Sequence, residues 1–174
     1  MSEDDVDRIV SAWRRERPEL DVTPLEILSR VSRLARRLDL ARGAAFSEHG
    51  LDSWEFDVLS ALRRAGRPYE LSPGQLVAQT LVTSGTMTNR VDRLLARGFV
   101  ERHPDPRDRR GVIVRLTPAG MRTVDAALDD LLTHERELLA DLPSGERDAL
   151  AAQLRVLLTP FERTAADSPL RPAR

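Results

Sequence analysis

The chain has 174 residues, 41% hydrophobic and 32% charged, which is typical of a soluble protein with one domain and helical extensions. It lacks cysteine and lysine, which excludes disulfides, thiol chemistry, a Schiff-base lysine and a phosphate-loop lysine. Its three histidines lack the spacing of a metal site, and its apolar runs fall short of the roughly 18 residues that span a bilayer. We therefore expect a cytoplasmic protein that is not an enzyme, has no cofactor or metal and does not contact a membrane.

Helix-start signals recur along the chain. Thr-Pro-Leu-Glu at 23–26 places a threonine at the N-cap, a proline in the first turn and an acid at the third position. Apolar residues then recur at steps of three and four, which predicts an amphipathic helix reaching towards His49. Ser-Pro at 72–73, Thr-Pro at 117–118 and Pro-Ser at 143–144 mark three further helix starts by the same logic.

The middle of the chain predicts three short helices. Residues 55–62 have a helical pattern that an arginine- and glycine-containing stretch then interrupts. Residues 73–80 and 84–97 follow as two more helices, separated by a short connection. Gly98 stands in the position that commonly ends a helix.

Two apolar stretches after these helices predict a β-hairpin. Residues 99–102 and 112–116 are the strands, and the polar segment 104–111 is the turn. Helix, turn, helix and a two-stranded hairpin is the order of a winged helix-turn-helix.

Leucine-rich helical patterns continue to the C-terminal region. Apolar residues recur helically between 124 and 139, and those from 150 to 161 are spaced by four, three and four positions. This spacing is a short heptad seam that requires a partner helix. Together with the helix at 23–49, it predicts an interface between two copies of the chain. The alternative is that these apolar stripes pack within one subunit.

The helix at 84–97 has two unlike faces at about 100° per residue. Met87, Val91 and Leu94 fall on one side, where they can attach the helix to the domain. Short hydrogen-bonding residues and arginines lie on the other side and its flanks, where they can reach base edges and phosphates in the major groove. The alternative is an ordinary solvated face. The residues predicted to contact DNA here are Ser84, Gly85, Thr86, Thr88, Asn89, Arg90 and Arg93.

The predicted hairpin adds a second basic group. Arg107, Arg109 and Arg110 lie near its tip, where they can contact phosphates or enter the narrow minor groove. From 84 to 110 there are seven arginines against four acidic residues, a local charge of +3 within a chain whose net charge is −1. A charge run is most often solvated surface, but beside a recognition-like helix it predicts a DNA-binding wing.

These motifs resemble the MarR family of bacterial transcription regulators. The likeness runs in order and spacing through 81–94, 97–102, the Asp-x-Arg wing at 105–110 and Leu-Thr-x-x-Gly at 116–120, and it covers about 24–161. The resemblance implies a mainly helical winged helix-turn-helix with a small β-hairpin and long N- and C-terminal dimerisation helices. It also implies a homodimer that binds a pseudo-palindromic site in double-stranded DNA and is released by a ligand.

A finer resemblance is to the urate-responsive branch of this family. Residues 4–17 predict an extra N-terminal helix before the usual first one. In that branch a tryptophan on the extra helix, an aspartate and arginines from the helix-turn-helix and first wing strand form a pocket for a small anion. The matching residues are Trp13, Asp57, Arg90 and Arg102, with Arg64 as a support for Asp57. An anion that attracts Arg90 or Arg102 would tilt the recognition helix and favour the DNA-free state.

Each of these assignments has an alternative. Trp13 can be a hydrophobic anchor of the extra helix, Asp57 a surface acid and Arg90 a phosphate contact. These side chains do not distinguish urate from another small anion such as a carboxylate. For the whole chain, the alternative is a helical dimer acting as a structural or protein-interaction module without DNA binding. This alternative does not explain the arginine-rich wing.

The sequence predicts four segments. Residues 1–49 hold the extra helix and the first dimerisation helix, and 50–116 form the winged helix-turn-helix region. Residues 117–166 are the C-terminal dimerisation helices, and 167–174, with two prolines, are a disordered tail.

Overall fold

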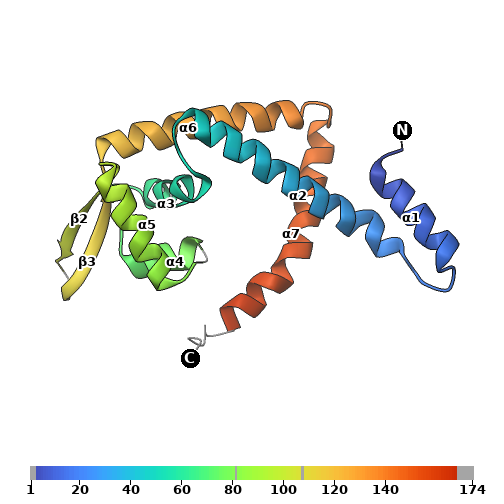
Figure 1. Ribbon diagram of the computed structural model, residues 1–174, viewed down its shortest axis with the longest axis horizontal. Helices are drawn as coiled ribbons and strands as arrows, with labels where there is room; N and C mark the ends of the chain where they lie inside the picture. The colour runs from blue at the N-terminus through green and yellow to red at the C-terminus, as the bar shows by residue number, and fades with distance from the viewer. Residues whose placement is uncertain (1–2, 81, 107, 168–174) are drawn as a thin grey trace. The chain divides into compact units, whose positions relative to one another are not determined.

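The computed structural model describes residues 3–80, 82–106 and 108–167, without the side chains at 109, 110 and 163–167. The chain forms two compact units, Met1–Leu131 and Leu132–Arg174. Figure 1 shows the elements coloured in chain order. They are α1 (Asp5–Glu16), α2 (Thr23–Glu48), α3 (Ser53–Arg64), β1 (Glu70–Leu71), α4 (Pro73–Thr80), α5 (Ser84–Ala96), β2 (Val100–Asp105), β3 (Asp108–Leu116), α6 (Pro118–Leu138) and α7 (Ser144–Asp167).

The predicted fold class is confirmed: the structure is mainly helical with a small antiparallel sheet. Over the described ranges, no helix combines the length and apolar character needed to cross a membrane.

The first helix, α1, spans Asp5–Glu16, within the range 4–17 where the sequence predicts a helix. The Asp4 side chain accepts hydrogen bonds from the backbone N–H of Val6 at 2.7 Å and of Asp7 at 3.1 Å. In return the Asp7 carboxylate accepts from the Asp4 N–H at 2.9 Å, which completes a capping box.

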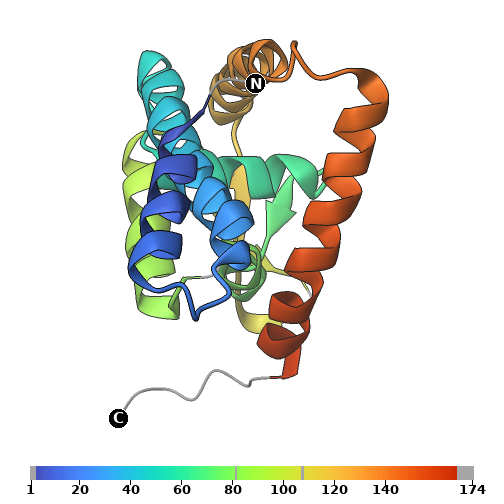
Figure 2. The same cartoon turned by 90° about the vertical axis from the view of Figure 1, so that its right-hand side faces the viewer.

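The helix α1 packs against the start of α2, and Figures 1 and 2 both show them side by side. Val6 and Val10 of α1 form a small apolar cluster with Val22, with Leu25 packed against it. Arg30 of α2 adds ion pairs to α1, with the carboxylates of Asp4 at 2.8 Å and Asp7 at 2.6 Å. Apolar contact and charge pairing therefore both hold α1 on α2.

The start of α2 differs from the prediction by one residue. We predicted Thr23 as the N-cap, but Thr23 is the first helical residue and Val22 precedes it without a side-chain cap. The Asp21 carboxylate accepts from the Thr23 N–H at 3.0 Å, so an acid two positions upstream satisfies this donor. The predicted length is confirmed, because α2 ends at Glu48.

A single apolar core joins α3, α4, α5, the sheet and the first part of α6. Its most buried large side chains include Leu59, Leu62, Leu76, Met87, Leu94 and Val114. From α6, Val124, Ala127 and Leu131 are buried in the same core. Arg63 of α3 also donates to the Asp125 carboxylate of α6 at 2.8 Å. The core therefore fixes α5 with its inward face against the domain.

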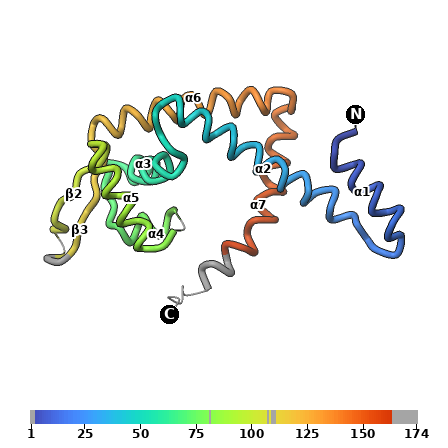
Figure 3. Tube along the Cα trace, viewed as in Figure 1, coloured from blue at the N-terminus to red at the C-terminus, as the bar shows by residue number. Residues whose placement is uncertain are grey.

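The sheet has three antiparallel strands in the order β1-β3-β2, one more than predicted. The added strand, β1, pairs Glu70 with Arg115 of β3, and the Arg115 side chain donates to the Glu70 carboxylate at 2.6 Å. The predicted turn at 104–111 is also too long, because β2 continues to Asp105 and β3 begins at Asp108. Figure 3 traces β3 back alongside β2. Backbone pairing between the strands extends into a segment whose side chains are mostly polar.

The junction between β3 and α6 depends on two residues of the Leu-Thr-x-x-Gly motif. Thr117 Oγ1 donates to the Gly98 carbonyl at 2.8 Å and accepts from the Gly120 N–H at 3.0 Å. A Cβ on Gly120 would lie 2.2 Å from the Phe99 carbonyl oxygen, so this close approach requires glycine. The motif therefore joins the end of α5, the wing and α6.

The second unit contains the end of α6 and the helix α7. Large apolar side chains of α7 are exposed in the single chain: Leu150, Val156, Leu157, Leu158 and Phe161. The predicted tail at 167–174 lies outside the described residues, except for Asp167, the last residue of α7.

Candidate nucleic-acid interface and anion site

The second helix of the helix-turn-helix, α5, has the two faces that its sequence predicts. Met87, Val91 and Leu94 are buried. The opposite face and flanks carry the predicted DNA-contacting residues, of which Arg90 is half-buried and Ser84, Gly85, Thr86, Thr88, Asn89 and Arg93 are exposed. Thr83 caps the helix by accepting from the Thr86 N–H at 3.3 Å. Burial of one face thus leaves the polar face open to solvent.

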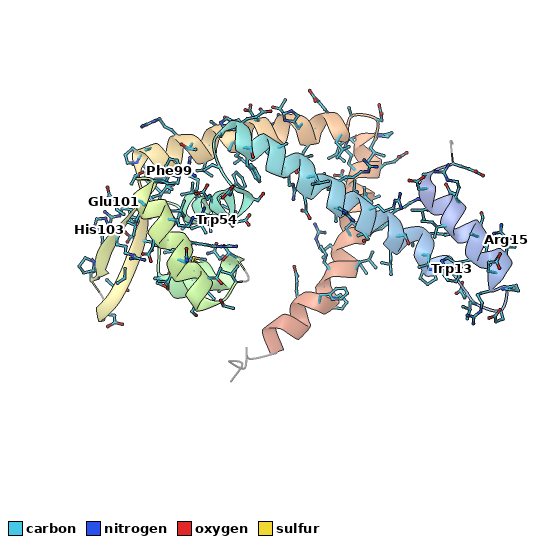
Figure 4. All side chains as sticks on the ribbon, in the orientation of Figure 1. Trp13, Arg15, Trp54, Phe99, Glu101 and His103 are labelled. Carbon is cyan, nitrogen blue, oxygen red and sulfur yellow. The ribbon has the colours of Figure 1, made fainter. Side chains whose placement is uncertain are left out.

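A hollow of about 490 Å³ lies on this polar face. Its lining consists of Trp54, Gly85, Thr86, Asn89, Arg90 and Arg93. Five of these residues belong to α5, whereas Trp54 comes from the first turn of α3 and is labelled in Figure 4. The hollow therefore combines two cations, small hydrogen-bonding side chains and one aromatic wall.

Trp54 binds the arginines of the hollow through its ring. The guanidinium carbon of Arg93 lies 4.7 Å from the ring centroid and that of Arg90 lies 5.5 Å away, within the range of cation–π interactions. Trp54 Nε1 donates to Asp52 Oδ2 at 3.0 Å, and Arg93 Nη2 lies 3.6 Å from the same oxygen. Trp54 is not among the residues predicted from the sequence. Its position one turn before Asp57, at the start of a helix, is the signal that could have indicated it.

The end of α5 is also attached to the first turn of α3. Glu55, with 2% exposure, accepts from the Asp52 backbone N–H at 2.9 Å and from Arg97, the C-cap of α5. Arg97 also donates to the Gly50 carbonyl at 2.7 Å and lies over the Phe99 ring, 4.6 Å from its centroid. Arg90 and Arg93 of α5 and its C-cap Arg97 are therefore all connected to residues 50–55.

The basic tip of the wing is only partly described. Arg107 lies outside the described residues. Arg109 and Arg110 belong to β3, and their side chains also lie outside the described part of the chain. Their predicted DNA contacts remain predictions.

Asp57 lies near three arginines. Partial burial raises the pKa of its carboxyl above the ordinary 3.8, while the positive charges of Arg90, Arg64 and Arg42 oppose that shift. Arg64 itself donates to Ser60 Oγ at 3.0 Å, so its support of Asp57 acts through charge. Asp57, Arg64 and Arg90 are thus close enough to interact electrostatically.

The other two predicted pocket residues have different surroundings. Arg102 pairs with the Asp92 carboxylate of α5 at 2.8 Å, which links the first wing strand to the recognition helix. Trp13 is 47% exposed on α1, beside the start of α2, and Figure 4 shows it far from Trp54. Within the described part of one chain, the predicted residues do not line one common cavity.

A helix-turn-helix followed by an antiparallel wing, with arginines on the polar face of the second helix, defines the class of winged helix-turn-helix proteins. A profile of the MarR family matches residues 49–111. The transcriptional regulator PecS of Dickeya dadantii is 37% identical over 150 residues, which are 86% of this chain and 90% of PecS. The chain belongs to the MarR family.

Two solved structures extend the comparison. A mutant MarR from E. coli complexed with operator DNA is 29% identical, with a TM-score of 0.65 over 80% of this chain and 99% of that one. Bordetella bronchiseptica BpsR, whose DNA binding is regulated by 6-hydroxynicotinic acid, is 30% identical. Its TM-score is 0.57, over 74% of this chain and 98% of that one.

Proposed function

We propose that this protein is a transcriptional repressor that places α5 in the major groove of a pseudo-palindromic operator and its wing against the adjacent backbone or minor groove. The observation that carries this proposal is the division of α5 into a buried face and an open face with Thr86, Asn89 and Arg93. Such residues donate and accept hydrogen bonds at base edges and phosphates. The complex of the related E. coli MarR with operator DNA supports the same assignment.

The proposed active form is a homodimer. In the single chain, α2 exposes large apolar side chains, including Ile27 at 58% and Leu40 at 70%. The helix α7 exposes its own set, among them Phe161 at 75%. Burying such surface against a second copy is favourable, and two-fold symmetry matches a pseudo-palindromic site.

The proposed effector is a small anion, with urate as the leading candidate and a carboxylate as the other. The charge cluster of Asp57, Arg64 and Arg90 supports this site, because an anion there would be attracted by the two arginines and repelled by the Asp57 carboxylate. Arg102 is a second contact that can transmit binding to α5 through Asp92. Trp13 enters this proposal through the family resemblance alone. The regulation of BpsR by 6-hydroxynicotinic acid gives a related example with a small carboxylic acid.

The test has two stages. Selection from a pool of random duplexes should enrich a pseudo-palindromic sequence, and failure to enrich any sequence would contradict operator binding. Urate, and separately 6-hydroxynicotinate, is then added to the complex with the selected duplex. Release by urate supports the leading candidate, release by the carboxylate alone replaces it, and no release by either contradicts the anion site.

A pair of variants localises the effector site. Arg102→Gln should reduce sensitivity to the releasing anion, because it removes a proposed contact. The matched control is Arg15→Gln on α1, which removes an exposed arginine paired only with its neighbour Glu16 at 3.0 Å among the described contacts. This control should keep the sensitivity of the unaltered protein.

A further inference from the structure

The first turn of α3 holds the arginines of α5 through one aromatic ring. Arg93 and Arg90 both lie over Trp54, at 4.7 and 5.5 Å from its centroid. The ring is itself oriented, because its Nε1 donates to Asp52 Oδ2 at 3.0 Å. One residue outside the helix-turn-helix therefore restricts two long, flexible side chains on the recognition helix.

A stacked guanidinium remains able to bind phosphate. Its N–H donors lie in the guanidinium plane, so stacking covers a face and leaves the donor edge available. The Arg93 side chain is 58% exposed, and both arginines line the 490 Å³ hollow that opens on the polar face of α5. Asp52 is only 3.6 Å from Arg93 in an exposed pair, which is weak enough for a phosphate to replace it.

We propose that Trp54 is a positioning residue for DNA recognition: it orders Arg90 and Arg93 for contact with DNA backbone phosphates at the hollow. The DNA-facing surface then includes the first turn of α3 in addition to α5 and the wing. Without the ring, each arginine must be ordered at the moment of binding, and this conformational restriction costs affinity. The inference rests on the proposed function, since it requires that the protein bind DNA.

The test compares Trp54→Leu and Trp54→Phe in a titration of the operator duplex at several salt concentrations. Trp54→Leu should weaken binding about tenfold, which corresponds to about 1.4 kcal/mol, because both arginines lose the ring that orders them before binding. Trp54→Phe, which keeps a ring, should recover most of that affinity. The matched control Tyr69→Leu removes another arginine–ring pair, that of Arg63 at 5.0 Å, and should bind as the unaltered protein does.

A double-mutant cycle separates positioning from a general structural effect. In an Arg90→Gln, Arg93→Gln background, Trp54→Leu should change the affinity by less than about twofold, since the side chains that it orders are gone. The same tenfold loss in that background would overturn the inference, as would unaltered affinity of Trp54→Leu in the original chain. If the unaltered protein binds no duplex, the proposed function and the inference about Trp54 both fail. If the unaltered protein binds and Trp54→Leu binds equally well, only the inference about Trp54 fails.

Discussion

Glu55 is a buried carboxylate that accepts two hydrogen bonds and so connects the start of α3 to the end of α5. It caps α3 through the Asp52 N–H and pairs with Arg97 at the end of α5. We expect Glu55→Ala to lower the free energy of unfolding by about 2 kcal/mol, because it removes a cap and a charge-assisted hydrogen bond. Urea denaturation measures this change. Glu101→Ala, at an exposed position beside His103, should change stability by less than about 0.5 kcal/mol, and equal losses would contradict the account.

Arg93 and Arg109 are expected to act on DNA binding and not on the fold. Arg93→Gln and Arg109→Gln should each weaken binding and reduce the slope of log affinity against log salt by about 0.9 for each phosphate that is no longer neutralised. Arg15→Gln, which removes the same charge on α1, should leave the slope unchanged. Fluorescence anisotropy at four salt concentrations measures the slopes. A slope unaffected by either arginine would show that the DNA-reading surface is placed wrongly.

At the level of elements, the attachment of α1 should depend on acid pH. The Arg30 guanidinium lowers the pKa of Asp4, and the Asp4 N–H together with Arg30 lowers the pKa of Asp7, both below 3.8. A folded-state pKa below the unfolded value means that the stabilisation is present above pH 3.8 and is lost as pH falls through the lowered values. Trp13 fluorescence in a Trp54→Phe background should therefore change only below pH 3.8.

The variant Arg30→Gln tests the cause of this pH dependence. It should move the acid transition of Trp13 fluorescence upwards, towards pH 3.8, because both carboxyl groups lose their cation. Arg36→Gln, on the same helix, is the charge-matched control and should leave the transition in place. A transition that Arg30→Gln does not move would show that the Arg30 ion pairs do not cause the pH dependence.

The junction of the wing with α6 gives a second prediction at this scale. Gly120→Ala should lower the free energy of unfolding by about 3 kcal/mol, because its Cβ would meet the Phe99 backbone. Gly74→Ala in α4 is the control, since its nearest neighbour is the Ser72 side chain at 3.9 Å; it should be neutral or stabilising by up to about 1 kcal/mol. Thermal or urea denaturation measures the free energy of unfolding of both variants, and equal changes for the two would contradict this prediction.

The elements that the sequence predicted correctly are those with local signals. Helix caps, a terminating glycine and apolar periodicity depend only on residues that are close in sequence. This is why α5 and the start of α6 agree with the prediction. The strand β1 was missed because two residues are too few to show an alternating apolar pattern, and because its partner Arg115 lies far from it in the sequence. Trp54 was missed for the same physical reason: its contacts with Arg90 and Arg93 arise from packing of α3 beside α5.

At the scale of the whole molecule, the positive charge and the exposed apolar side chains belong to different segments of the sequence. The segment 84–110 carries a local charge of +3 although the chain as a whole carries −1. Large apolar side chains are exposed on α2 and, in the other unit, on α7. In the proposed dimer these apolar faces are buried against a second copy, and two copies of the basic segment are presented to one duplex.

The central claim, that this chain is a sequence-specific DNA-binding regulator, is tested most directly by titrating it onto the selected duplex and onto a scrambled duplex of the same composition. We expect two protomers per selected duplex, affinity that falls steeply with salt, and at least about 10³-fold weaker binding to the scrambled duplex. Equal affinity for the two duplexes, or no binding to either, would contradict it.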